Sequence, residues 1–547
     1  MTTPRADLVV SGQVVVAATA AGLETVEAVG IGGGRVLAAG RRGEVEDAAA
    51  PGARYVDAGD GVVVPGLHDA HLHLAGLARH QLEVALDGAP DFAEIIERVA
   101  AGARRAPPDA WILGRGWTER TMDRSALERL DAACDGRRAW LSSHDGHSAW
   151  VSSAALELAG ISTATADPPG GRIERRPDGM PDGILRETAR DLVEPVVVRP
   201  RGDELAPALR ATLDDLASLG LTGSTDMGAY TTDKGQGRYA GLGDDFSAIA
   251  ELLDELDGRL RLALGFPAAA LLSGAVQDAG LVTGAPLGDG ATVRVGWAKA
   301  YADGALGSRT AALFAPYTCG DLDDRGILRL EPDLLDEIVA CAREARVAVA
   351  VHAIGDRTVA FVLDALERAG PPAGGVPPDR IEHAQLVRPI DRPRFAALDV
   401  LASMQPIHAP ADRSMVEDCW GGREENAYAI GSLAASGARL VFGSDAPVER
   451  VNPWHGLLAA VRRRLPGEPD PGWRPEEAID VGAALFAYTL GPGAALGSVD
   501  VGHLWPGAHA DLAVLDVGLE ALREAGDELA GARSVLTLVG GREVFRS

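Results

Sequence analysis

Basic residues are scarce in this chain, and lysine is the scarcest of them. The 547 residues include 52 Lys and Arg against 79 Asp and Glu, which gives a formal net charge of -27, and only Lys234 and Lys299 are lysines. This surplus of negative charge repels phosphate backbones and anionic lipid headgroups, so nucleic acids and membrane surfaces are poor partners. The charge favours a small-molecule substrate instead.

Cysteine is also rare, with four residues and no CxxC spacing: Cys134, Cys319, Cys341 and Cys419. A chain of this length can bury a large apolar core without covalent cross-links. We therefore expect reduced thiols and a cytoplasmic location.

Long apolar runs and aromatic residues are missing as well. No segment approaches the roughly 18 unbroken apolar residues that a membrane span requires. The early stretch LVVSGQVVVAATAAG has no basic segment before it and continues as short Val-rich runs between Gly turns, so we expect strands here and not a signal peptide. Aromatics make up 5% and hydrophobic residues 46%, which is typical of a globular core of Ala, Val, Leu and Ile.

Two β-rich ends enclose a middle of alternating strands and helices. Residues 1–64 and 496–547 read as short strands around Gly turns, which predicts one small β-sandwich domain built from both termini. Residues 65–495 show the rhythm of βα units, with an inserted subdomain at about 77–200. Eight apolar runs fit the strands of a TIM-like (β/α)8 barrel, namely residues 62–74, 221–228, 259–266, 293–304, 347–356, 380–387, 400–409 and 439–448.

Metal-ligand side chains lie at or near the carboxyl ends of four of these runs. They are His71, His73, His352, His383 and Asp445. The first two are two residues apart on a strand and point to the same face. Imidazole and carboxylate groups suit zinc and similar divalent ions, and the active sites of such barrels lie at this end. The pattern therefore predicts a metal site.

Lys299 lies in the apolar strand VRVGWAKAYADG of the same barrel. A buried lysine, unlike arginine, can lose its proton. Its amine can then react with carbon dioxide, and the resulting carbamate could bridge two metal ions roughly 3.5 to 4 Å apart. The simpler alternatives are an ion pair with Asp303 or a snorkelling side chain. Lys234, in a polar run, is expected to be a solvated loop cation.

Read together, these residues resemble the amidohydrolase superfamily, in the branch that includes the N-substituted formamide deformylases. The resemblance spans nearly the whole chain and is carried by VVPGLHDAHLHL, SSHDGHSAWVSSAAL, GGRIERRPDGMPDGILRE, AKAYADGALGSRTAAL, VAVHAIGDRTV, RIEHAQLV, SMQPIHAPAD, VFGSDAPV and GSVDVGHLWPGAHADLAVLD. It implies one metal on His71, His73 and Asp445, and a second on His352 and His383, with carbamylated Lys299 as the bridge. The additional His68 falls outside the HxH pair, and we expect a structural role for it.

The resemblance also implies a reaction. Two divalent ions, zinc first among them, would supply a metal-bound hydroxide that hydrolyses a non-peptide, amide-type C–N bond of an N-formyl or N-acyl amine. Asp445 would act as general acid and base. Candidate substrate contacts at the barrel mouth are Trp117, His147, Arg309 and His408.

Two other functions stay open at this point. One is a mononuclear aminohydrolase that deaminates a heterocycle, although the run HAIGD lacks the HxxE spacing of that class and would leave Lys299 without a task. The other is a metal-binding regulatory homologue without turnover. The residues do not fix the metal, since such ligands admit Zn, Mn, Fe or Co, nor the oligomeric state, for which a homodimer is one possibility.

Overall fold

Eight parallel strands form a barrel at the centre of the molecule, as expected from the sequence. The computed structural model describes residues 5–19, 21–118, 122–123, 126–228, 239–290, 292–320 and 323–547, so Lys234 lies outside the described residues. The strands follow chain order around the sheet and pair in parallel throughout. They are β5 (Leu67–Leu72), β12 (Leu221–Asp226), β13 (Arg261–Pro267), β14 (Val293–Tyr301), β15 (Val349–Ala353), β16 (Arg380–His383), β17 (Leu401–Met404) and β18 (Leu440–Phe442).

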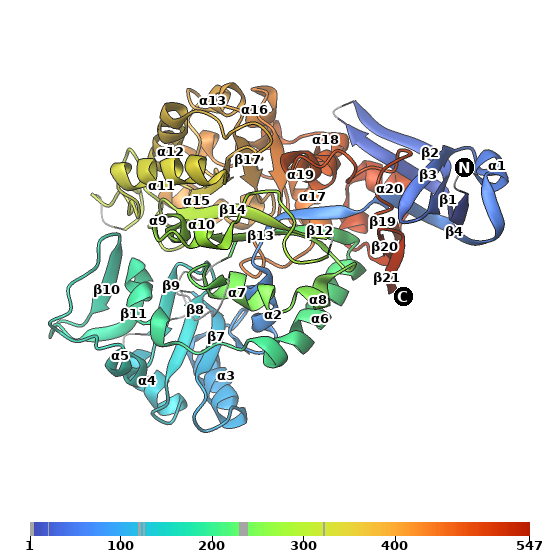
Figure 1. Ribbon diagram of the computed structural model, residues 1–547. Coiled ribbons are helices and arrows are strands. Elements are labelled where there is room, and N and C mark those ends of the chain that lie inside the picture. The colour runs from blue at the N-terminus through green and yellow to red at the C-terminus, as the bar shows by residue number, and fades with distance from the viewer. Residues whose placement is uncertain are drawn as a thin grey trace.

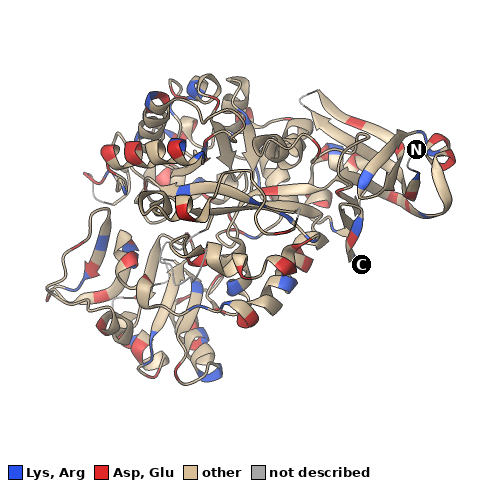
Figure 2. Cartoon of the chain, in the orientation of Figure 1, with Lys and Arg blue, Asp and Glu red and all other residues tan. Residues whose placement is uncertain are grey.

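Amphipathic helices cover the outside of this barrel. Helix α11 (Pro332–Ala345) is representative, because its buried residues Leu335, Ile338, Val339 and Ala342 recur every three or four positions and form one apolar face. Charged residues of both signs lie along outer helices such as α6 (Gly202–Ser218) (Figure 2). The strands are buried on both sides, which explains why they read as unbroken apolar runs.

The two chain ends share one seven-stranded sheet beside the barrel. Its order is β21-β20-β19-β4-β1-β2-β3, and both termini lie on this side of the molecule (Figure 1). The strands are β1 (Ala6–Thr19), β2 (Gly22–Gly32), β3 (Arg35–Gly40), β4 (Ala49–Pro65), β19 (Leu512–Leu515), β20 (Ser534–Val539) and β21 (Arg542–Arg546). The predicted separate β unit made from both termini is present, whereas the exact domain limits 1–64, 496–547 and 65–495 stay predictions.

The chain segment between the first two barrel strands forms a third sheet. It has six strands in the order β10-β11-β9-β8-β7-β6, with helices α3 (Phe92–Arg105), α4 (Ala126–Ala133) and α5 (Ser153–Leu158) packed on it. The strands are β6 (Val84–Ala85), β7 (Ile112–Trp117), β8 (Ala139–Ser143), β9 (Ser148–Val151), β10 (Gly171–Arg175) and β11 (Pro181–Glu187). In Figure 1 this sheet occupies the lower left, next to the barrel. Among the described residues, no helix is both long and apolar enough to cross a membrane.

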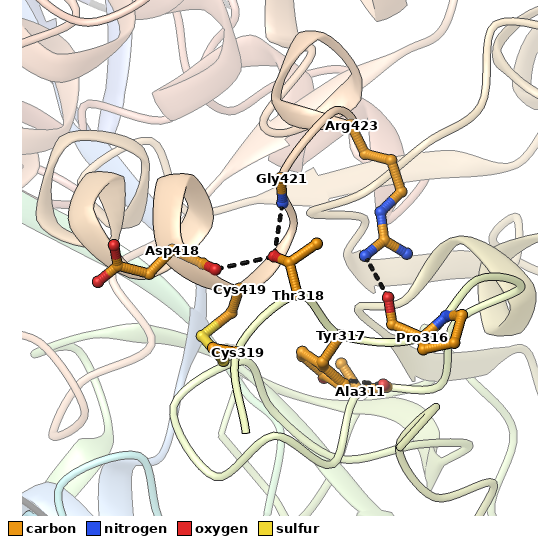
Figure 3. The surroundings of a disulfide bond; sticks show 9 residues. All are labelled: Ala311, Pro316, Tyr317, Thr318, Cys319, Asp418, Cys419, Gly421 and Arg423. Carbon is orange, nitrogen blue, oxygen red and sulfur yellow. Dashed lines mark hydrogen bonds between the residues drawn. A yellow bond between two sulfur atoms is a disulfide. The ribbon is translucent and has the colours of Figure 1, made fainter. Parts of the chain in front are cut away.

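The expectation of four reduced thiols is wrong for one pair. Cys319 and Cys419 form a disulfide, with their Cα atoms 4.6 Å apart, that joins the loop after β14 to the end of α15 (Arg413–Cys419). The surroundings hold both segments in place, since the Thr318 hydroxyl donates to the Asp418 carbonyl and accepts from the Gly421 amide (Figure 3). The barrel brings together loops separated by 100 positions, a proximity that cysteine spacing alone cannot show. The other two cysteines, Cys134 and Cys341, are free thiols.

Removal of this cross-link should destabilise the protein. Because the bond closes a loop of about 100 residues, the double substitution Cys319→Ser and Cys419→Ser should lower the free energy of unfolding by about 2–4 kcal/mol, measured by urea denaturation. Cys341→Ser, at a free and half-buried position, is the matched control and should change stability by less than about 1 kcal/mol. Equal stability of the double variant and the parent, or four alkylatable thiols in the non-reduced protein, would contradict the assignment.

Candidate metal centre

The six predicted ligand positions converge at the carboxyl end of the barrel. Three of them lie within the last three residues of a strand, namely Lys299 on β14, His352 on β15 and His71 on β5. His383 is the last residue of β16, while the other two follow a strand, His73 directly after β5 and Asp445 three residues after β18. The structure therefore brings together residues from five strands of the barrel.

The ligand atoms of three of these side chains form a tight cluster. Single ligand atoms of His71, His383 and Asp445 lie within 4.8 Å of one another. The Asp445 Oδ1 atom is also 3.2 Å from His73 Nε2. The rings of His352 and His383 complete the group, with centroids 4.5 Å apart.

Several buried polar atoms in this group have no protein partner. They are His71 Nε2, His73 Nδ1 and Lys299 Nζ. Buried polar atoms are normally hydrogen-bonded, because an unpaired one costs about 1–3 kcal/mol. The imidazole nitrogens of His71 and His73 converge on the Asp445 carboxylate, a ligand set that fits a divalent metal ion. The residues present therefore fit a metal centre.

The backbone around Asp445 closes the barrel at this point. Its amide donates to the His71 carbonyl at 2.7 Å and so joins the last strand to the first. Asp445 has a left-handed backbone with φ of 60°, a conformation that costs free energy in a non-glycine residue. Gly443 allows this close approach of the two segments, since a Cβ atom there would lie 2.3 Å from the backbone nitrogen of His71.

The charge state of Asp445 follows from its neighbours. Burial alone would raise the pKa of this carboxyl, which is only 6% exposed. The positive charge of His71, whose Nε2 lies 3.3 Å from Asp445 Oδ1, and a hydrogen bond from His73 outweigh burial and hold the pKa of Asp445 well below its usual range. Asp445 is therefore an anion, the form that binds metals.

Glu382 orients His71, and the sequence did not point to it. The His71 Nδ1 donates to Glu382 Oε2 at 2.5 Å, which leaves Nε2 directed at the cluster. Arg380 donates to the same carboxylate, so its charge and that of His71 hold the pKa of Glu382 well below normal although burial acts to raise it. A carboxylate behind a liganding histidine fixes its tautomer and strengthens metal binding. Alternation along a strand predicts that Glu382 and His383 point to opposite faces, so the sequence pattern did not predict that both contact His71.

The other two imidazoles are also held in one orientation. Gln405 accepts from His383 Nδ1 at 2.8 Å, and the Gly304 carbonyl accepts from His352 Nε2 at 3.1 Å. The remaining nitrogen of each ring is thereby left as an acceptor. Burial, followed by nearby positive charges, lowers the pKa of both histidines well below the ordinary value, so both are neutral ligands.

Lys299 is buried and unpaired, as the apolar strand around it suggested. It is 2% exposed, its Nζ lies 4.9 Å above the ring of Tyr301, and burial lowers its pKa to about 8 even though Glu382 and Asp445 act to raise it. The alternative ion pair with Asp303 does not form. That carboxylate instead accepts backbone N–H groups of Ala312, Ile354 and Gly355.

Two connected cavities adjoin the cluster. The larger has a volume of about 300 Å³ and reaches His352, His383 and Asp445. The smaller, of about 90 Å³, reaches the same three residues together with His73 and Lys299. The candidate metal centre therefore lies where a substrate could reach it.

Three of the four predicted substrate contacts line the larger cavity. These are Trp117, His147 and His408. Trp117 is 1% exposed and donates its indole N–H to the Leu141 carbonyl, so it also packs in the core of the inserted sheet. Arg309 is half-buried and is not among the described residues that line this cavity.

His68 is separate from the site, as expected. Its Nε2 is paired with the Thr225 hydroxyl at 2.9 Å, and burial lowers its pKa to about 3.

The inserted sheet supplies an ionic network that the sequence did not reveal. His147 Nδ1 donates to Glu187 Oε2 at 3.0 Å, and Glu187 also pairs with Arg329 and accepts from Thr310. Glu187 ends β11 with φ of 51°, so this turn holds the carboxylate in place. Burial acts to lower the pKa of His147, but Glu187 outweighs it and raises the pKa above normal. No spacing rule links these positions, because they lie on separate segments of the chain.

Comparisons with known proteins agree with this geometry. A sequence profile of the amidohydrolase family matches residues 54–545. The chain is 31% identical to "Protein LONG AFTER FAR-RED 3" of Arabidopsis thaliana over 95% of this chain and 88% of that protein. It is 31% identical to "Putative amidohydrolase YtcJ" of Bacillus subtilis (strain 168), over 79% of each chain. It is 26% identical to the N-substituted formamide deformylase of Arthrobacter pascens, over 90% of each.

A solved structure shares the fold. An uncharacterized metal-dependent hydrolase from Pyrococcus furiosus superposes with a TM-score of 0.69 at 26% identity, covering 93% of this chain and 98% of the other. The resemblance inferred from the motifs is thereby confirmed.

Loss of the carboxylate behind His71 should weaken metal binding. Glu382→Gln removes the charge that orients the imidazole, and we expect a 10- to 100-fold loss of affinity for Zn²⁺ in competition with a chelator. Glu477→Gln is the matched control, because Glu477 is equally buried but bonds to Ser432 outside the site. Unchanged affinity in Glu382→Gln would contradict the role of the Glu382 charge in metal binding.

Proposed function

The chain belongs to the amidohydrolase family of metal-dependent hydrolases, and from this premise we propose that it hydrolyses a non-peptide amide C–N bond in an N-formyl or N-acyl amine. The observation that carries the proposal is the set of buried, unpartnered atoms His71 Nε2 and Lys299 Nζ beside Asp445. The similarity to a formamide deformylase over 90% of each chain supports this substrate class.

The chain offers ligands for two divalent ions. His71, His73 and Asp445 would hold one, and His352 and His383 the other, with zinc as the first candidate. A bound ion would supply an activated water near neutral pH and would polarise the substrate carbonyl.

We propose that Lys299 bridges the two ions as a carbamate. Its uncharged amine would attack carbon dioxide, forming an N–C bond and releasing one proton, and the two carbamate oxygens would then bind the ions. The burial of Lys299 and the lack of a partner for its Nζ support this role. Arginine could not replace it, because a guanidinium stays charged.

Asp445 would move the proton that the reaction requires. Its carboxylate is ionised and faces both cavities, so it can accept a proton from the attacking water. It can then pass this proton to the departing nitrogen, which otherwise leaves poorly as an anion. Trp117, His147 and His408 would contact the substrate from the cavity wall, whereas a contact from Arg309 stays a prediction.

Two alternatives remain distinguishable by experiment. A mononuclear deaminase would need only one ion and would leave Lys299 unmodified. A homologue without turnover would bind metal but hydrolyse no amide. A cytoplasmic location and a homodimer stay predictions from the sequence.

Metal content separates the first two functions. The protein saturated with Zn²⁺ and desalted should contain close to two ions per chain by inductively coupled plasma mass spectrometry. Lys299→Met should retain one ion or less, because the bridging group is gone. Two ions in Lys299→Met would rule out the bridge, and one ion in the parent protein would favour the deaminase.

Turnover depends on Asp445 in this account. With a panel of N-formyl and N-acetyl amines, Asp445→Asn should lower kcat by about 10²–10⁴-fold, because the proton acceptor is lost. The ions in each sample are counted, so that loss of metal is not mistaken for loss of proton transfer. No turnover of any amide by the fully metal-loaded parent protein would favour the non-catalytic homologue.

A further inference from the structure

The larger cavity has several carboxylates in its walls. Three carboxylates line it in addition to Asp445, namely Asp145, Asp412 and Glu449, and all three are half-buried. Among the described residues that line the cavity there is no Lys or Arg. With divalent ions at the Asp445 end, the cavity would be positive at its floor and negative toward the exposed residues Ala411 and Ser414.

One of these carboxylates makes no hydrogen bond with the residues that the structure describes. Asp145 accepts from the Ser143 hydroxyl and the His147 amide, and Asp412 accepts from the Tyr428 hydroxyl. Glu449, on the loop after β18, has no side-chain hydrogen bond or ion pair in the described part of the chain. Burial raises the pKa of Glu449 although the charges of His408 and His144 act to lower it, which reflects the cost of keeping this carboxylate partly out of water without a hydrogen bond.

Two buried groups in the same cavity also lack partners. Gln385 Oε1 and His408 Nε2 form no hydrogen bond within the protein. Water cannot easily replace the missing partners, because the two residues are only 4% and 8% exposed. The Gln385 amide donates to His408 Nδ1 at 3.4 Å, so the imidazole hydrogen is on Nε2. The pair therefore offers one acceptor and one donor close to His383, whose ring stacks on that of His408. Such a pair is complementary to the N–H and C=O groups of an amide.

Apolar residues separate these polar groups. Leu306, Ile354, Met415 and Val448 line the cavity and contribute hydrocarbon surface. A polar, an apolar and a negative region in one cavity match a ligand with an amide, an alkyl spacer and a cation.

We propose that this cavity selects N-acyl amines whose amine half carries a second, positively charged nitrogen, such as an ammonium or guanidinium group, with Glu449 as its main contact. The inference rests on the proposed hydrolase function and narrows its substrate class. The carbonyl is oriented toward the floor by the polarity of the cavity, and the cation is oriented toward Glu449 and Asp412. The net charge of -27 also attracts cationic substrates from solution.

The test compares two amides of equal shape. N-acetyl-1,5-diaminopentane carries an ammonium group where N-hexylacetamide carries a methyl group. The metal-loaded protein should hydrolyse the charged amide with at least tenfold higher kcat/KM, and this ratio should fall when ionic strength rises from 0.05 to 0.5 M. Equal or better hydrolysis of the neutral amide would overturn the proposal.

A pair of variants assigns the preference to one side chain. Glu449→Gln should lower the charged-to-neutral ratio of kcat/KM at least fivefold, with metal content and circular dichroism unchanged as evidence of folding. Glu157→Gln, at an exposed position on α5 that does not line the cavity, removes the same charge and should keep the ratio. An unchanged ratio in Glu449→Gln would contradict the role of Glu449.

Binding separates this inference from the proposed function. The hydrolase function fails if no amide of the panel is hydrolysed, and calorimetric titration of these two amides then decides the cavity's preference. At least tenfold tighter binding of the charged amide, reduced in Glu449→Gln, would support the cationic site. Equal binding of the two amides would refute it.

Discussion

The structure depends on a group of buried polar atoms that the protein itself leaves unpaired. His71 Nε2, His73 Nδ1 and Lys299 Nζ are buried near the barrel mouth without hydrogen bonds. Their burial would be costly for the folded state unless a ligand satisfies them, and a divalent cation satisfies several at once. Metal binding and stability of the barrel mouth are therefore coupled.

The surrounding residues keep these atoms in place. Glu382, Gln405 and the Gly304 carbonyl each bind the second nitrogen of one histidine and so select the nitrogen that faces the centre. The bond from the Asp445 amide to the His71 carbonyl links the last barrel strand to the first. The same contact that closes the barrel thus sets the positions of two ligands, which makes the site rigid.

Much of the barrel could be predicted from the sequence because burial on both faces leaves a clear signal. The eight apolar runs correspond to β5 and β12 to β18. The strands are shorter than the runs, because residues 62–65 belong to β4 and the carboxyl ends of most runs belong to the loops that carry the site. The ligand positions followed from histidine and aspartate at these ends. Glu382, the His147–Glu187 pair and the Cys319–Cys419 disulfide could not be found in this way, because each depends on tertiary contacts between segments far apart in the chain.

The most direct test of the account is a crystal structure of the Zn²⁺-saturated protein with anomalous data collected at the zinc edge. We expect two anomalous peaks, one within about 2.2 Å of His71 Nε2 and the other at a similar distance from His383. Density for a carbamate on Lys299 Nζ should lie between them. A well-occupied map with a bare Lys299 amine and no anomalous peak near His71 would contradict it.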